Sequence, residues 1–98
     1  MSLQATATVE VSADISLRVP RGGSETLESG VAEVLDAVTG VTEASVDRVR
    51  GVRPAATDIH VDAAVRLRVA LPESADPAAR LADGFGIVEV HAVSVDPV

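Results

Sequence analysis

A strict two-residue alternation of apolar and polar side chains runs from Ala5 to Val19 and constrains the fold more than any other feature. The odd-numbered positions hold only Ala, Val, Ile or Leu, and the even-numbered positions hold Thr, Glu, Ser, Asp or Arg. This period, with one apolar face, is typical of a half-buried β-strand. The same pattern returns from Asp58 to Leu71, where odd-numbered residues are again apolar and Pro72 ends the run. The sequence therefore predicts two long strands, each with one buried face.

A helix is predicted between these strands. The segment 20–23 (Pro-Arg-Gly-Gly) interrupts the first strand, and Ser24 is expected to cap a helix of about four turns that ends at Gly40. Its apolar residues recur at spacings of three and four, as on one face of an amphipathic helix. They are Leu27, Val31, Val34, Leu35 and Val38.

Three further elements complete the expected chain order. A less regular strand is predicted from about Thr42 to Val49, followed by a loop from Gly51 to about Thr57. A short helix is predicted over 75–83, with Pro77 in its first turn. A last strand is expected from Ile87 to about Val95. The expected core contacts of the short helix are Leu81, Ala82 and Phe85.

This order predicts one α+β domain over residues 1–98, a ferredoxin-like βαββαβ sandwich. Such a domain is a four-stranded antiparallel sheet with two helices on one face, and its first and third strands lie at the centre. Residues 1–4 are expected to be disordered or derived from expression, and they are left out of the fold.

The two central strands should be antiparallel, so the numbers of opposed residues have a constant sum. A sum of 76 predicts Glu10 opposite Arg66, an opposite-charge pair. The same register sets Asp14 opposite Asp62, which is unfavourable unless a cation or an Arg lies between them. The other pairs expected from this register are Arg18 with Asp58 and Ser16 with His60.

Composition excludes several classes of function. The chain has 15 acidic and 8 basic residues, a net charge of −7, no cysteine and a single aromatic residue. Nucleic-acid binding is not expected, because the charge repels phosphate and no aromatic platform can stack bases. Without cysteine there can be no disulfide and no thiolate metal site, and no cofactor is expected. No membrane helix or signal peptide is evident, so a cytoplasmic protein is predicted.

Two groups of residues are candidates for ligand binding. Asp58, His60 and Asp62 share one strand face and could bind a divalent cation; the alternative is a solvated face whose charges keep it soluble. Four arginines could bind an anion. Three of them lie in the second strand or its loop, and the fourth precedes the first helix. The alternative is that they pair with the abundant acids. They are Arg21, Arg48, Arg50 and Arg53.

Catalysis is not expected. No Ser lies in a Gly-x-Ser-x-Gly turn, and no nucleophile is predicted beside His60 or His91. We therefore expect a protein that is not an enzyme.

Self-association is the function that the sequence favours. Val93 and Val95 break the alternation of the last strand, so that strand is expected to bury both faces against another chain. The chain is expected to be a small homo-oligomeric or partner-binding domain. The alternative is a regulatory module that binds an anionic small molecule through the arginines.

The stretch 38–47 (Val-Thr-Gly-Val-Thr-Glu-Ala-Ser-Val-Asp) resembles the helix-to-strand passage of heavy-metal-associated, copper-chaperone-like domains. The resemblance implies the same order of strands and helices. Those domains bind metal through two cysteines between the first strand and the first helix, where this chain has Pro-Arg-Gly-Gly-Ser over 20–24. Soft-metal transport is therefore not implied for this chain.

Overall fold

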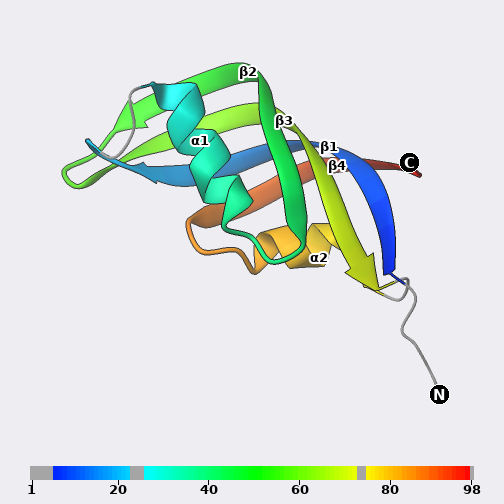
Figure 1. Cartoon of the computed structure of the whole chain (residues 1–98). Helices are drawn as coiled ribbons and strands as arrows, with labels where there is room; N and C mark the ends of the chain where they lie inside the picture. The colour runs from blue at the N-terminus through cyan, green and yellow to red at the C-terminus, as the bar shows by residue number, and fades with distance from the viewer. Residues whose placement is uncertain (1–5, 23–25, 73–74, 98) are drawn as a thin grey trace.

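The computed structural model describes residues 6–22, 26–72 and 75–97 (Figure 1). Residues 1–5 and Ser24, on which some sequence-based expectations fall, lie outside these ranges. The strands are long and the helices short. In chain order the elements are β1 (Thr6–Pro20), α1 (Leu27–Asp36), β2 (Val41–Pro54), β3 (Asp58–Pro72), α2 (Pro77–Ala82) and β4 (Ile87–Pro97).

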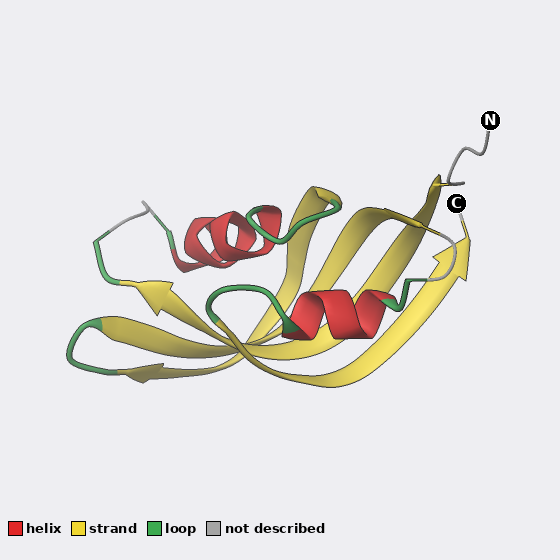
Figure 2. Cartoon of the chain, turned by 90° about the horizontal axis from the view of Figure 1, so that it is seen from below, coloured by secondary structure: helices red, strands yellow, loops and turns green. Residues whose placement is uncertain are grey.

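The strands form one antiparallel sheet in the order β2-β3-β1-β4. This confirms the small α+β domain and the central position of the first and third strands. Figure 2 shows both helices on the same face of the sheet. The odd-numbered side chains of β1 and β3 point toward those helices, so the opposite, outer face carries the even-numbered polar residues.

The predicted register between β1 and β3 is wrong by two residues. Glu10 lies opposite Arg68, and Arg66 lies opposite Ser12. Asp14 lies opposite Ala64, so the expected clash with Asp62 does not arise. A shift of two leaves every side chain on its predicted face, because strand side chains alternate with period two. The other two pairs change in the same way: Arg18 lies opposite His60, and Ser16 lies opposite Asp62.

Strand β2 is longer than predicted and runs through the expected loop to Pro54. Its alternation is irregular because its register against β3 shifts three times, leaving Thr42, Asp47 and Arg50 as extra residues. A β-bulge of this kind reverses the inward and outward pattern beyond it. The sequence pattern therefore breaks while the strand continues.

Helix α1 is shorter than predicted. Its N-cap is Thr26, two residues beyond the expected cap, and the Thr26 hydroxyl accepts a hydrogen bond from the Ser29 N–H at 3.0 Å. The helix ends with Ala37 as its C-cap, not at Gly40. Gly40 instead occupies the turn into β2 with φ +95°. The carbonyl of Gly40 accepts a hydrogen bond from the Ala70 N–H at 2.7 Å.

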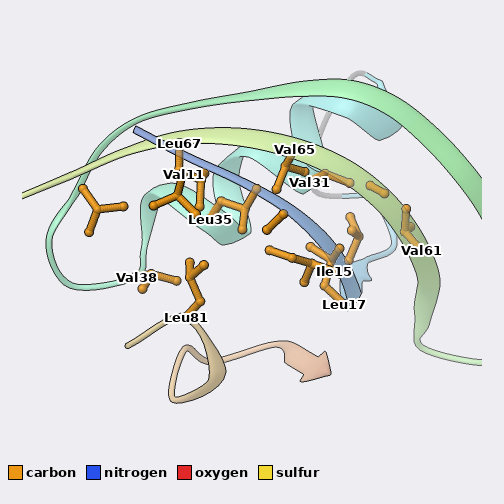
Figure 3. Packing of buried hydrophobic residues seen from close by; sticks show 14 of the residues in the cluster. Val11, Ile15, Leu17, Val31, Leu35, Val38, Val61, Val65, Leu67 and Leu81 are labelled. Atoms are coloured by element: carbon orange, nitrogen blue, oxygen red, sulfur yellow. The ribbon is translucent and has the colours of Figure 1, made fainter. Parts of the chain in front are cut away.

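The core lies between the helices and the inner face of the sheet (Figure 3). Val31, Leu35 and Val38 of the α1 segment are buried in it, as their spacing predicts. Helix α2 buries Leu81 alone. Ala82 and Phe85 are exposed, so their expected core contacts are wrong.

Candidate functional sites

Exposed side chains on the outer face of the sheet form several ion pairs. Arg66 lies 3.4 Å from Asp47 and 3.9 Å from Glu10, and Arg68 lies 3.9 Å from Glu43. Exposed pairs of this kind contribute about 0–1 kcal/mol each. They fit the alternative that arginines on this face pair with acids of the same chain.

The four arginines predicted to bind an anion do not converge on one point. Arg50 is paired with Asp14, with Nη1 and Oδ2 2.9 Å apart. Arg48 lies opposite Ala64 and Arg53 opposite His60, and both lie on β2, which continues into the expected loop as far as Pro54. Arg21 follows β1, and its N–H donates to the Thr57 carbonyl at 3.5 Å.

The predicted cation ligands share the outer face as expected, but all three already have protein partners. His60 Nε2 lies 3.5 Å from Asp58 Oδ1, and Asp62 accepts a hydrogen bond from the Ser16 hydroxyl. Across the described ranges, no three His, Asp or Glu side chains are placed to hold a metal ion.

The structure corrects the expectation that neither histidine has a nucleophile beside it. His91 Nε2 lies 2.7 Å from Ser16 Oγ, and His91 Nδ1 lies 3.6 Å from Glu89 Oε2. Ser16 Oγ in turn lies 2.5 Å from Asp62 Oδ1. With Arg50 and Asp14 close by, the His91 and Asp62 side chains line a shallow hollow of about 270 Å³.

This cluster is a cross-strand clamp, in which side-chain hydrogen bonds join Asp62 of β3, Ser16 of β1 and His91 of β4. The Ser16 hydroxyl has one proton and donates it to Asp62, so its oxygen accepts a hydrogen bond from His91 Nε2–H. In this arrangement His91 donates to the serine oxygen, which differs from a catalytic triad, where the histidine accepts the serine proton. The backbone of β1 is paired on both sides, which leaves its N–H groups unavailable to an oxyanion.

A β-bulge brings His91 to Ser16. The register between β1 and β4 shifts twice, leaving Val88 and His91 as extra residues between paired ones. The same bulges explain why Val93 and Val95 break the alternation of the last strand. No signal in the sequence marks where these bulges fall.

Strand β4 forms one edge of the sheet, and its regular part is 92–97, opposite residues 9–14 of β1. Val93 lies opposite Ala13 and packs against the core, whereas Val95 is 44% exposed. Of the two predicted interface residues, Val95 is therefore the more accessible.

The sequence pattern predicts Phe85 to be a core contact of the short helix, but the structure places it in solvent. It is 95% exposed in the turn between α2 and β4. Gly86 has φ +88°, and its carbonyl accepts a hydrogen bond from the Arg18 N–H at 2.8 Å. At Gly84 a Cβ atom would come within 2.6 Å of Val38 Cγ2. The two glycines thus fix the turn against the core and direct Phe85 outward. A glycine on each side of Phe85 is the sequence signal that could have revealed its exposure.

Comparisons with protein-family models, curated proteins and solved structures found no match to this chain. In the part of the chain that the structure describes, no helix is long and apolar enough to cross a membrane.

Proposed function

We propose that this chain is a small, non-enzymatic, cytoplasmic domain with a ferredoxin-like fold that acts by homo-oligomerisation through its edge strand β4. The fold assignment is supported by the βαββαβ element order and by the sheet order β2-β3-β1-β4. The role of the Ser16–His91 contact as a clamp between strands supports a non-enzymatic domain.

One observation carries the proposal of self-association. Among the described residues, the four exposed large hydrophobic side chains all lie on the two edge strands or on the turn into β4: Val52, Phe85, Val88 and Val95. A sheet edge offers unpaired backbone N–H and C=O groups to another strand. Apolar side chains along it add the contacts that make such pairing stable.

Charge favours the β2 edge of a second copy as the partner of β4. Strand β4 carries the exposed acids Glu89 and Asp96 and no arginine. Strand β2 carries Arg48, which has no ion-pair partner within the described residues, and the exposed Val52. Joining unlike edges is a head-to-tail contact, which closes into a ring or continues as an open chain.

Light scattering over a range of protein concentrations tests this proposal. The wild-type chain is expected to show a mass that grows with concentration, and Val95→Glu is expected to remain a monomer because it places a charge in the apolar contact. Thr8→Glu, an exposed position on the central strand β1, is the matched control and should associate like the wild type. A wild-type chain that is monomeric at every concentration would refute self-association.

A charge exchange tests the choice of partner strand. Arg48→Glu should weaken association, and adding Glu89→Arg to it should restore association, because the opposite charges then face each other again. If Arg48→Glu has no effect on the mass, the partner of β4 is not β2.

A further inference from the structure

Three basic side chains form a row across the outer face of the sheet, near the β2–β3 hairpin. Arg18 of β1 lies directly opposite His60 of β3, and His60 lies directly opposite Arg53 of β2. Directly opposed residues share one face, with Cβ atoms about 4.5–5.5 Å apart. Arg18 and Arg53 are exposed, and His60 is half-buried between them.

This row has fewer acidic partners than the rest of the face. Arg50, Arg66 and Arg68 each have a carboxylate within 2.9–3.9 Å. Within the described ranges, no carboxylate lies within ion-pair distance of Arg18, Arg53 or the nearby Arg21. One acid contacts the row: Asp58 Oδ1 lies 3.5 Å from His60 Nε2.

Such an arrangement is unusual in a chain with 15 acidic and 8 basic residues. The row brings the positive charges of Arg18 and Arg53 to one face without a carboxylate on either of them, and like charges on one sheet face repel. An anion that lies over it would remove that repulsion. Arginine is well suited to this role, because its planar guanidinium donates paired hydrogen bonds to phosphate or carboxylate oxygens.

We propose that Arg18, His60 and Arg53 form a binding site for a small oxyanion, a molecule that carries a phosphate group or several carboxylates. The backbones of Arg18 and Arg53 lie two strand spacings apart, about 10 Å. The two guanidinium groups can therefore bind the oxyanion from opposite sides, with His60 on the strand between them. Arg21 adds positive charge at the same end, since its N–H donates to Thr57 in the β2–β3 hairpin.

The proposed site differs from the arginine group that the sequence suggested. It keeps Arg53 and gains Arg18 and His60, which only the register places beside it. The proposed site does not include Arg50, because Arg50 already forms an ion pair with Asp14. It does not include Arg48 either, because Arg48 lies farther along β2, opposite Ala64.

Backbone amide NMR shifts during titration with inorganic phosphate, and separately with citrate, test the proposal. We expect saturable shifts centred on residues 18, 53 and 60, and the tighter probe shows whether phosphate or carboxylate chemistry is recognised. Arg18→Gln and Arg53→Gln should each weaken binding about tenfold, the loss of one charge-assisted contact. Both residues are exposed, so the variants should fold; their spectra check this.

Arg80→Gln is the matched control, because it removes one positive charge from an arginine in α2 that also has no ion-pair partner among the described residues. It should leave the affinity unchanged. The proposed site would be refuted if the amide shifts do not saturate with either probe, or if Arg80→Gln loses as much affinity as Arg18→Gln and Arg53→Gln. Either result would mean that anions are attracted only by general positive charge. The titration is repeated on Val95→Glu, so that the result does not depend on self-association.

Discussion

Gly40 shows how a single residue fixes the path between a helix and a strand. It has φ +95°, where a side chain is strained, and an added Cβ would lie 2.8 Å from the Ala70 carbonyl oxygen and 2.9 Å from Leu71 Cδ2. Its own carbonyl accepts the Ala70 N–H. The turn after α1 therefore lies directly against β3, and only glycine fits.

Replacing Gly40 with Ala should destabilise the fold for two separate reasons. The left-handed backbone costs about 1–2 kcal/mol with a side chain, and displacing Leu71 and the β3 backbone costs about 1–3 kcal/mol more. Gly22→Ala isolates the first cost, because Gly22 has φ +75° but nothing within 4 Å of an added Cβ. Urea unfolding of both variants should show the larger loss for Gly40→Ala; equal losses would mean that the close approach to β3 is not tight.

At the scale of elements, the two helices are anchored to very different extents. Helix α1 has ten residues and buries Gly30, Val31 and Leu35, whereas α2 has six and buries Leu81 alone. A helix this short is not stable by itself in water, so its formation depends on tertiary packing. Leu81 thus determines whether α2 stays docked.

Leu81→Ala should cost about 2–5 kcal/mol of unfolding free energy, the usual range for a fully buried leucine. Urea unfolding measures this loss, and hydrogen exchange should show that α2 amides lose protection before those of β1 and β3. Ala82→Ser, at the exposed neighbouring position, is expected to change stability by less than about 0.5 kcal/mol. Uniform loss of protection across the sheet in Leu81→Ala would show that α2 does not open separately.

The two edge strands, β2 and β4, determine where a second copy of the chain could pair with the sheet. Bulges interrupt β2 at three places and the start of β4 at two, and bulges protect edges from unwanted pairing. Two stretches that carry an exposed valine remain regular, 92–97 of β4 with Val95 and 51–54 of β2 with Val52. These are the parts of the two edges on which the proposed association would begin.

For the whole molecule, electrostatics should make stability depend on salt. The net charge is −7, and the ion pairs on the outer face involve exposed side chains that each contribute little. Self-repulsion among the excess acids should therefore outweigh the attractive pairs.

Raising NaCl from about 0.1 M to about 1 M shortens the screening length from about 10 Å to about 3 Å. We expect Tm of the Val95→Glu monomer to rise by about 5 °C, which corresponds to about 1 kcal/mol for a domain of this size. Thermal unfolding followed by circular dichroism measures the change. A falling Tm would show that the ion pairs contribute more than the repulsion costs.

The sequence alone determined which side of the sheet each residue of β1 and β3 faces. Alternation over Ala5–Val19 and Asp58–Leu71 sets the inner and outer faces through the period of the strand, which a shift of two residues does not change. Helix spacing likewise identified Val31, Leu35 and Val38 as buried. Local periodicity is enough for these features, because each depends only on the geometry of one element.

Only the tertiary structure decided which side chains meet. The register of β1 against β3 brings Arg18, His60 and Arg53 into one row, and a bulge in β4 brings His91 to Ser16. The exposure of Phe85 depends on how the flanking glycines pack against α1 and β1. Register and bulges are set by the balance of packing between strands that are far apart in sequence, so no local pattern specifies them.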